Sequence, residues 1–452
     1  MATVMIMTAM PMTIPSTAIP TIGRDSRSAR SLSTRIRRAM KCETFTGIPD
    51  RWSAAKIGAC VAALLLISAC GQGQPRLLDN GTGPIKVGAE RTGEYLPLLQ
   101  GERVAVASNQ TGLIGNVHLV DSLLALKVNV VKVFCPEHGF RGDADAGAHI
   151  EDEIDTKTGL PINALYGENF KPTALQLADV DVIVFDIQDV GVRWYTYIST
   201  LHYIMEAAAE QGKQVIILDR PNPNGFYVDG PIMERSFTSF VGMHPVPMVH
   251  GMTVGEYGRM INGEGWLKGG RTCELTVIPC ASYDHNALYE LPVKPSPNLP
   301  NMSSVYLYPS LTLFEGTIVS VGRGTDKPFQ CIGYPGCTAG RYTFTPKSMP
   351  GAKNPPYLGK ECSGMDLQAY GAIQARLDER LSLHWLLEMY RDAADKSKFF
   401  NSFFEKLAGG NGLREQIISG ADEGTIRATW KPGLDAFKTI RAKYLLYPDF
   451  SP

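Results

Sequence analysis

The stretch that decides the fold is DVIVFDIQD, residues 181–189. Its first half, Val182 to Phe185, is an unbroken apolar run rich in β-branched residues. Such a run is typical of a strand buried on both faces, as in a parallel sheet covered by helices. Asp186, Gln188 and Asp189 follow it directly. The stretch therefore predicts a buried parallel strand with polar chemistry at its carboxyl end.

Strands and helices alternate on both sides of this stretch. This alternation predicts an α/β fold, a Rossmann-like parallel sheet with helices on both faces. The SNQTGLIG segment after the first strand contains neither GxGxxG nor GK[ST], so we expect no dinucleotide. The predicted strands are residues 103–107, 130–134, 161–165 and 214–219, and the predicted helices are residues 117–125, 173–178 and 199–211, the last one stopped by Gly212.

Polar residues follow the other predicted strands as well. Asn109 follows the first strand, Glu137 and His138 follow the second, and Asn222 follows the last. In an open parallel sheet, ligands bind outside the carboxyl ends of the strands. We therefore expect these loops to converge on one cleft, although the prolines around Asn222 also suit a plain turn.

Glu137, in the segment VFCPEHGFRG, is the main candidate for acid–base chemistry. It is flanked by Phe134, Pro136 and Phe140, and apolar surroundings favour the protonated form of a carboxyl group. A protonated carboxyl group at a strand end suits a general acid. Arg141 is either a substrate ligand or, in the alternative interpretation, the partner of Glu137 in a structural salt bridge.

The segment FDIQDVGVRWYTY predicts a sugar-binding surface. Asp186, Gln188, Asp189, Arg193 and Tyr195 supply carboxylates, an amide, a guanidinium and an aromatic ring close together. Aromatic faces pack on the C–H groups of a pyranose, while the polar groups take its hydroxyls. The alternative is a helix that begins at an aspartate cap, with the aromatic rings in the core.

Three further candidates lie later in the chain. His250, in HGMTVGE, is also explained as a loop histidine beside a capping box formed by Thr253 and Glu256. Glu315, in LFEGT, and Arg323, in GRGT, lie in a long connector that can fold over the cleft. We interpret the Gly-rich VGRGTDKPF as a substrate loop, with phosphate binding as the alternative.

The composition limits the partners of the protein. Its 44 Lys and Arg residues against 45 Asp and Glu residues give a net charge of −1, so no polybasic field is available for nucleic acid. No CxxC or Cys/His spacing indicates zinc. A cation site formed by Asp143, Asp145 and His149 is an alternative, but these residues are also common in solvated loops.

The N-terminal region is typical of a bacterial lipoprotein. A short basic flank precedes the apolar run from Ile57 to Ala69, which ends at Cys70 in ISAC-G. The run is short for a bilayer span but suits a signal peptide. We predict a signal over residues 40–70 that places a lipid on Cys70, and we interpret residues 1–39 as a mis-called or disordered extension. The protein would then be anchored to the membrane in the cell envelope, facing the periplasm or exterior.

The rest of the chain divides into two predicted domains. A linker over residues 71–85 leads to a Rossmann-like catalytic domain over residues 86–290. Residues 291–452 read as a smaller α+β domain that closes the cleft, with helices in LHWLLEMYRDA, FFNSFFEKLAG and FKTIRAKYLLYPDF. An oxidising compartment permits disulfides, and the closest cysteines in the sequence are Cys273 with Cys280 and Cys331 with Cys337.

Eight motifs in order carry a resemblance to a known family. They are ASNQTG, CPEHGFRG, FDIQDVGVRWYTY, LDRPNP, HGMTVGE, PNLPN, YPSLTLFEGT and GRGTDKPF. Together they resemble the NamZ-type exo-β-N-acetylmuramidases, a glycoside hydrolase family once known only as a domain of unknown function. The resemblance extends over about residues 90–450.

The resemblance implies a reaction as well as a fold. It implies release of β-1,4-linked N-acetylmuramic acid from the non-reducing end of peptidoglycan fragments, in a cleft between the two domains, without nucleotide or metal. It also implies Glu137 as the catalytic carboxyl group. Asp186, Asp189 and Glu315 are the candidates for a second one, and the 2-acetamido group of the substrate offers a third route. Arg193 or Arg323 would pair with the lactyl carboxylate.

Two other functions compete with this prediction. A tethered lipoprotein with a cleft can simply capture muropeptides, and such a binder needs no carboxyl group in a desolvated pocket. An amidase acting on the stem peptide would normally need a zinc triad or a Cys/His pair, and neither stands out in the sequence.

Overall fold

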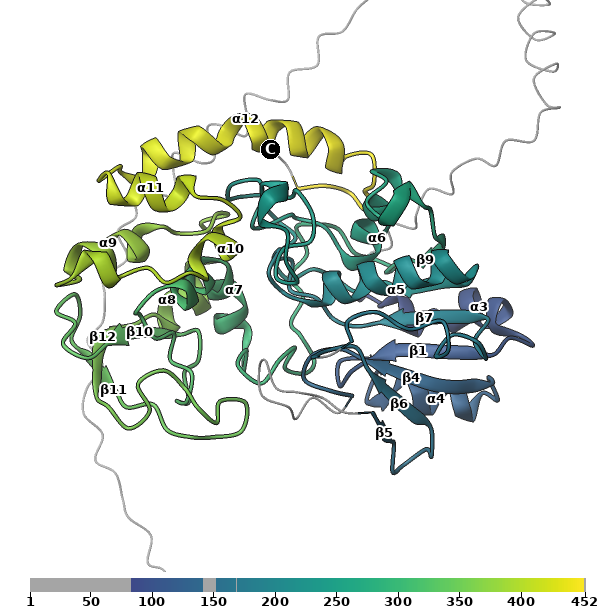
Figure 1. Cartoon of the computed structure of the whole chain (residues 1–452). Coiled ribbons are helices and arrows are strands. Elements are labelled where there is room, and N and C mark those ends of the chain that lie inside the picture. Colours follow the sequence, from purple (N-terminus) through teal and green to yellow (C-terminus); the bar gives the residue numbers. More distant parts are fainter. Residues whose placement is uncertain (1–82, 141–151, 168, 451–452) are drawn as a thin grey trace, which may run out of the picture. The chain divides into compact units, whose positions relative to one another are not determined.

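The structure is a computed structural model that describes residues 83–140, 152–167 and 169–450. Within these residues a seven-stranded sheet has the order β5-β6-β4-β1-β7-β8-β9 (Figure 1). Its neighbouring strands are parallel except for the edge pair β5–β6, which confirms the predicted Rossmann-like sheet. The strands are β1 (Val104–Ser108), β4 (Val130–Cys135), β5 (Glu153–Ile154), β6 (Pro161–Ala164), β7 (Val182–Asp186), β8 (Gln214–Leu218) and β9 (Glu274–Ile278).

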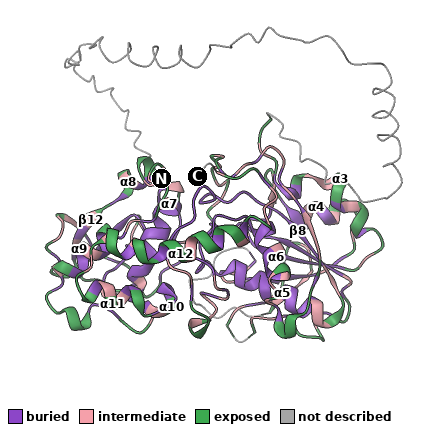
Figure 2. Ribbon diagram, turned by 90° about the horizontal axis from the view of Figure 1, so that it is seen from above, coloured by how far each residue is buried: buried purple, intermediate pink, exposed green. Residues whose placement is uncertain are grey.

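Helices cover both faces of this sheet, as the unbroken apolar run predicts. Ile183 and Phe185 of β7 belong to the core that contains α5 and α6, whereas Val182 and Val184 belong to the core that contains α3 and α4. Figure 2 shows that most of α5 is buried, and every residue of β7 is buried as well. These helices are α3 (Thr92–Tyr95), α4 (Leu119–Ala125), α5 (Tyr197–Gln211) and α6 (Val254–Gly263).

The three helices predicted around the sheet agree with the structure to different degrees. The helix predicted over residues 199–211 is confirmed as α5, which ends at Gly212 with a φ of 62°. The one predicted over residues 117–125 starts later, because β3 (Val117–His118) pairs with β2 (Leu113–Ile114) before α4 begins. The helix predicted over residues 173–178 is wrong, since these residues form turns. There Thr173 and Gln176 exchange the reciprocal hydrogen bonds of a capping box, but only turns follow.

The residues after 300 form a small antiparallel sheet and several helices. The sheet has the order β10-β12-β11, and α9 confirms the helix predicted in LHWLLEMYRDA. Helix α7 forms in a proline-rich stretch that looks like a loop in the sequence. Helix α12 begins well before the predicted helix FKTIRAKYLLYPDF. The elements are α7 (Met302–Leu311), β10 (Cys331–Tyr334), β11 (Tyr342–Phe344), β12 (Cys362–Asp366), α8 (Gln368–Ile373), α9 (His384–Asp392), α10 (Phe404–Ala408), α11 (Gly412–Ile418) and α12 (Glu423–Arg441).

The cysteines do not form the disulfides that their sequence spacing suggests. All six cysteines in the described ranges are free and buried. Cys331 and Cys337 belong to different apolar clusters, and the Cys331 thiol lies 3.5 Å from the Lys327 carbonyl. Neither Cys273 with Cys280 nor Cys331 with Cys337 is therefore joined in the structure.

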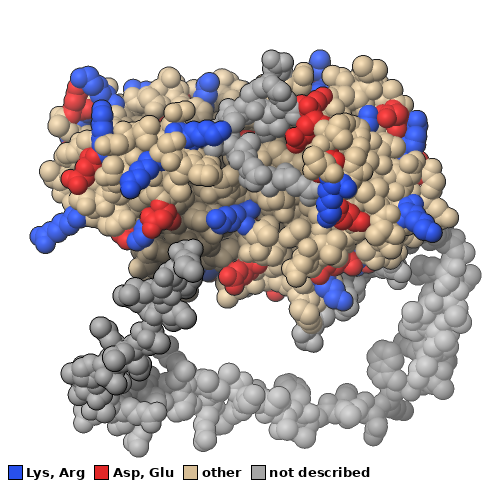
Figure 3. Space-filling model, turned by 90° about the horizontal axis from the view of Figure 1, so that it is seen from below, with Lys and Arg blue, Asp and Glu red and all other residues tan. Residues whose placement is uncertain are grey.

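Some sequence-based predictions lie outside the described residues. These are the signal segment with Cys70, and the loop with Arg141, Asp143, Asp145 and His149. Among the residues that the structure does describe, no helix has the length and apolar character needed to cross a membrane. Figure 3 shows acidic and basic side chains interspersed on one face of the molecule, in line with the near-zero net charge.

Candidate active site

The candidate active site is a cavity of about 600 Å³ at the carboxyl end of β4. This volume is in the usual range for small-molecule sites. Of the sequence-predicted residues, Glu137, Glu315 and Arg323 line it. Its wall also includes Tyr166, Trp194, Thr196, Tyr308, Pro355 and Phe403.

Glu137 is half-buried, and a hydroxyl group at the start of α5 holds it. Its Oε2 accepts a hydrogen bond from Thr196 Oγ1 at 2.8 Å, and Tyr166 lines the same cavity. Burial and the charge of Glu137 raise the pKa of Tyr166, which therefore stays a donor. His138 follows with a φ of 73°, so the chain turns sharply and the buried imidazole does not line the cavity. The strand and the start of α5 thus fix the orientation of the carboxyl group.

Glu315 and Arg323 form an ion pair in the wall of the same cavity. Arg323 Nε donates to Glu315 Oε1 at 2.7 Å, and the Phe329 ring lies 5.0 Å from the guanidinium carbon. Burial lowers the pKa of Arg323, but the charge of Glu315 more than compensates, so the pKa is raised. Its terminal nitrogens donate to no group within the described ranges. A charged guanidinium with this fork available is suited to bind a carboxylate.

Two glycines let the loops around Arg323 pack closely. Gly324 has a φ of 80°, and a Cβ there would lie 2.5 Å from Pro355 Cγ in the cavity wall. Gly351, with a φ of 81°, accepts a hydrogen bond from Asn298 Nδ2 at 2.8 Å through its carbonyl oxygen. Residues with side chains rarely adopt this backbone conformation, so both positions favour glycine. The Gly-rich segment thus positions Arg323 in the cavity wall.

Tyr195 and Asp189 lie behind the cavity wall. The Tyr195 ring packs edge-on against Tyr197 at 4.8 Å and against the cavity residue Tyr308 at 5.9 Å. Asp189 Oδ1 accepts the Gly191 N–H at 2.6 Å, while its Oδ2 has no donor among the described residues. Burial raises the pKa of Asp189 to about 7. Asp189 is therefore a buried carboxyl group that supports the site from behind.

Asp186 does not reach the cavity. Its two oxygens accept hydrogen bonds from Arg220 Nε at 2.6 Å and Nη2 at 2.9 Å, and the side chain is fully buried. A carboxylate neutralised in this way is not available to a sugar. The catalytic role predicted for Asp186 is thus at odds with the structure. Arg220, which follows β8, binds both carboxylate oxygens of Asp186.

Arg193 also lies away from the cavity. Its Nη1 donates to the carbonyl groups of Pro231 and Val246, and its Nη2 donates to those of Leu407 and Ala408. The last two carbonyls end α10, where a cation is favourable. The guanidinium is fully buried, so Arg193 is not placed to bind the lactyl carboxylate.

Asn109 and Gln188 connect three strand ends below the cavity. Asn109 Oδ1 accepts the Thr111 N–H at 3.0 Å, and Thr111 Oγ1 accepts the Gln188 N–H at 2.9 Å. Gln188 Nε2 then donates to the Pro221 carbonyl at 2.7 Å. Both predicted ligands are buried and neither lines the cavity, so they hold the loops together.

Asn222 and His250 belong to a separate, closed region near the end of β8. Asn222 Nδ2 donates to the Met252 carbonyl at 2.9 Å, and His250 Nδ1 accepts the Met252 N–H at 3.2 Å. The predicted capping box of Thr253 and Glu256 is confirmed at the start of α6. Neither predicted ligand lines the cavity.

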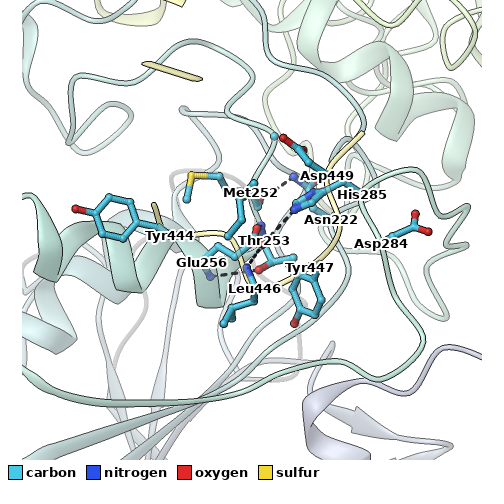
Figure 4. A network of polar contacts seen from close by, with 12 residues as sticks. Asn222, Met252, Thr253, Glu256, Asp284, His285, Tyr444, Leu446, Tyr447 and Asp449 are labelled. Carbon is cyan, nitrogen blue, oxygen red and sulfur yellow. Dashed lines mark hydrogen bonds and ion pairs between the residues drawn. The ribbon is translucent and has the colours of Figure 1, made fainter. Parts of the chain in front are cut away.

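A buried polar network fills this closed region (Figure 4). Asp219 accepts hydrogen bonds from Thr253 Oγ1 at 2.7 Å, the Gly255 N–H at 2.8 Å and the Tyr447 hydroxyl at 2.6 Å. His285 Nε2 lies 3.1 Å from Glu256 Oε1, and both side chains are completely buried. This network ties the C-terminal tail to the sheet.

Several residues that line the cavity are not predicted from the sequence. Tyr166, Thr196 and Tyr308 stand in or beside segments that the sequence singles out, but each reads there as an ordinary strand-end, helix-cap or core residue. Phe403 and residues 351–356 carry no signal of their own, because they reach the cavity only through the folding of the C-terminal part.

Together the fold and the cavity define a Rossmann-like α/β protein with a carboxyl group, a guanidinium and aromatic rings around a sugar-sized site. The family models described as "Exo-beta-N-acetylmuramidase NamZ", N-terminal and C-terminal, match residues 104–303 and 306–447. The chain is 38% identical over 385 residues to the peptidoglycan beta-N-acetylmuramidase NamZ of Bacillus subtilis (strain 168), covering 78% of this chain and 89% of that protein. The chain therefore belongs to the NamZ family of exo-β-N-acetylmuramidases, which confirms the predicted resemblance.

Two solved structures are similar to the chain as well. Both are DUF1343 family proteins from Bacteroides fragilis NCTC 9343. The first has a TM-score of 0.76 and 47% identity, and the match covers 81% of this chain and all of that one. The second has a TM-score of 0.67 and 30% identity, with 80% and 99% covered.

Proposed function

We propose that this protein is a glycoside hydrolase that releases β-1,4-linked N-acetylmuramic acid from the non-reducing end of peptidoglycan fragments. The observation that carries the proposal is the cavity itself. It is lined by the half-buried Glu137 and by an Arg323 guanidinium whose terminal nitrogens have no partner among the described residues. The family and the activity named for the Bacillus subtilis relative support the same reaction.

Glu137 is the proposed general acid. Glycoside hydrolysis requires protonation of the glycosidic oxygen as the bond to the anomeric carbon breaks. The hydrogen bond from Thr196 orients the Glu137 carboxyl group for this transfer. After the proton leaves, the same donor stabilises the carboxylate, because hydrogen bonds to a charged acceptor are the stronger ones.

Glu315 is the second carboxylate that we assign to the reaction. It lines the same cavity as Glu137, whereas Asp186 is paired with Arg220 and Asp189 lies behind the wall. In this position Glu315 either activates water or orients the 2-acetamido group of the sugar. Arg323 then binds the lactyl carboxylate, which distinguishes muramic acid from glucosamine.

The first experiment measures N-acetylmuramic acid released from the MurNAc-GlcNAc disaccharide by the purified protein. We expect free N-acetylmuramic acid and N-acetylglucosamine in equal amounts, and NMR of the first anomer formed assigns retention or inversion. Tight binding of the disaccharide without release would instead identify a sugar-capturing protein.

We also propose that the protein is a lipoprotein of the cell envelope, anchored through Cys70. The proposal rests on the basic flank, the apolar run and the ISAC-G ending in the sequence. Expression of the full chain should place it in the membrane fraction, and Cys70→Ala should release it or leave it unprocessed. An unchanged distribution of the variant contradicts the anchor.

A further inference from the structure

Residues 193–196 form a short segment that contacts two parts of the chain that are far apart in the sequence. At its end, Thr196 Oγ1 donates to Glu137 Oε2 at 2.8 Å. In its middle, Trp194 lines the candidate active site. At its start, Arg193 donates to two carbonyl groups at the end of α10, the first of them 214 residues later in the chain. The segment therefore links the loop of Glu137 to the C-terminal part of the protein.

The guanidinium of Arg193 clamps the end of α10 against two other loops. Its Nη1 donates to the carbonyl groups of Pro231 at 3.0 Å and Val246 at 2.8 Å. Its Nη2 donates to those of Leu407 at 2.8 Å and Ala408 at 2.9 Å. The residue after α10 is a glycine, and a Cβ there would lie 2.7 Å from Nη2. Because buried carbonyl groups need donors, the guanidinium fixes where α10 ends.

The other end of α10 is tied to the backbone of Glu315. Asn401 Nδ2 donates to the Glu315 carbonyl at 3.3 Å, and the Asn401 N–H donates to the Gly316 carbonyl at 2.9 Å. The two backbones also touch, since a Cβ on Gly316 would lie 2.4 Å from Phe404 Cα. Phe403, just before α10, lines the same cavity as Glu315. Helix α10 has only five residues, so in a closely packed interior a shift at one end also moves the other.

The spacing of two carboxyl groups decides what they can do to a glycosidic bond. A pair about 5 Å apart acts through a covalent intermediate, whereas a pair about 8 Å apart leaves room for a water molecule. A misplacement of about 1 Å can lower the rate about 100-fold. The position of Glu315 relative to Glu137 is therefore as important as the two groups themselves, whichever role Glu315 takes.

We propose that Arg193 is a positioning residue, which fixes Glu315 relative to Glu137 through α10. The inference rests on the proposed function, because that function assigns both carboxyl groups to the reaction. Thr196 holds Glu137 from the end of the segment 193–196, and Arg193 holds the Glu315 wall from its start. One segment thus sets the spacing of the two groups, although Arg193 itself does not line the cavity.

The test measures kcat and KM of Arg193→Lys on the MurNAc-GlcNAc disaccharide. An ammonium group presents its donors at one point and cannot reach all four carbonyl groups, so we expect kcat to fall about tenfold while KM changes by less than about twofold. Arg341→Lys, at an exposed position, is the matched control and should keep the wild-type kcat.

The decisive comparison repeats the substitution in a Glu315→Asp background. The shorter side chain already displaces the carboxylate there, so a residue that acts through Glu315 has little left to change. We expect Arg193→Lys to lower kcat by no more than about twofold in this background. A general loss of structure would instead lower kcat by the same factor in both backgrounds.

A second variant, Asn401→Ser, covers a failure of Arg193→Lys to fold. Asn401 is exposed, and a serine hydroxyl can still accept the Phe403 N–H, as Asn401 Oδ1 does at 2.8 Å. It loses the amide bond to the Glu315 carbonyl, so we expect kcat to fall about threefold, and only when Glu315 is intact. Ser402→Ala, at the exposed neighbouring position, is its control.

The outcomes separate this assignment from the proposed function. If the wild type releases N-acetylmuramic acid but the folded variants keep its kcat, the positioning role is wrong while the muramidase stands. The same conclusion follows if the variants lower kcat equally with Glu315 and with Glu315→Asp. If the wild type does not cleave the disaccharide, the proposed function fails and this assignment fails with it.

Discussion

Two acidic clusters lie at the carboxyl edge of the same sheet, and they differ in what covers them. Glu137 follows β4 and faces a cavity of about 600 Å³. Asp219 follows β8 and is completely buried below the C-terminal tail, which contributes the Tyr447 hydroxyl. In sequence both are carboxyl groups that end a buried strand.

The two clusters differ in how many of their polar groups already have hydrogen-bond or ion-pair partners. Asp219 receives four hydrogen bonds from the chain, and Glu256 is paired with His285. In the open cluster, the terminal nitrogens of Arg323 still point to no group of the described chain. Satisfied buried polar groups stabilise a unique structure, whereas groups with free capacity at a cavity can bind and react. The closed cluster therefore serves stability, and the open one serves function.

The largest effect should come from Glu137→Gln. Glutamine keeps the shape and can still accept from Thr196, but it has no proton to give, so we expect kcat to fall about 10³-fold with little change in the melting temperature. The rate of muramic acid release tests the expected fall in kcat, and a thermal unfolding curve tests the expected melting temperature. Glu361→Gln, at an exposed position, is the control. A large loss of stability in Glu137→Gln would erase the contrast between the two clusters.

Asp219→Asn should show the opposite pattern. An amide places an N–H₂ group against donors such as the Gly255 N–H, so we expect the free energy of unfolding to fall by about 3 kcal/mol. The folded fraction should keep the wild-type kcat, since Asp219 does not line the cavity. Urea unfolding with Asp435→Asn as the exposed control measures the difference. Loss of kcat in fully folded protein would show that the closed cluster takes part in the reaction.

The sequence predicts the sheet better than it predicts the site. The apolar runs predict β1, β4, β7 and β8, because a strand that is buried on both faces is visible in the sequence as a continuous apolar run. Asp186 and Asp189 are three residues apart and chemically alike, yet only the first is neutralised by Arg220. That difference depends on a guanidinium from another strand end, and no local pattern records it.

The same limit explains Arg193. An arginine beside aromatic residues is a reasonable carboxylate ligand in sequence, but the end of α10 supplies carbonyl oxygens that take up its donors. Arg323 is recognisable because two glycines flank it, and Gly324 in particular allows the close packing against Pro355. Long-range contacts therefore decide which of two similar side chains is left for the substrate.

Arg323→Met sharpens the assignment within the open cluster. If Arg323 binds the lactyl group, the variant should lose about tenfold of the preference for N-acetylmuramic acid over N-acetylglucosamine, because a charge-assisted bond to the carboxylate is lost. Calorimetric titration of both free sugars measures this preference. Arg341→Met, at an exposed position, is the control. Equal weakening for both sugars would mean that Arg323 acts only by holding Glu315.

The smallest effect concerns the closed region and its response to acid. Burial, then the positive charges of Arg441 and His285, lower the pKa of His250 from 6.5 to about 3. Between these two pH values His250 is protonated in the unfolded chain but not in the folded chain. The free energy of unfolding therefore falls as the pH falls through 6.5.

For His250 alone this loss is about 1 kcal/mol at pH 6. Asp219 acts in the opposite direction, because burial raises its pKa to about 6, and the folded state then holds a proton that the unfolded state has lost between pH 3.8 and 6. His250→Asn removes only the histidine contribution. Its stability should therefore decline less than that of the wild type from pH 7.5 to pH 6, as measured by urea unfolding at each pH. The exposed His384→Asn should follow the wild type, and equal slopes for all three proteins would mean that the pKa of His250 is the same in the folded and unfolded states.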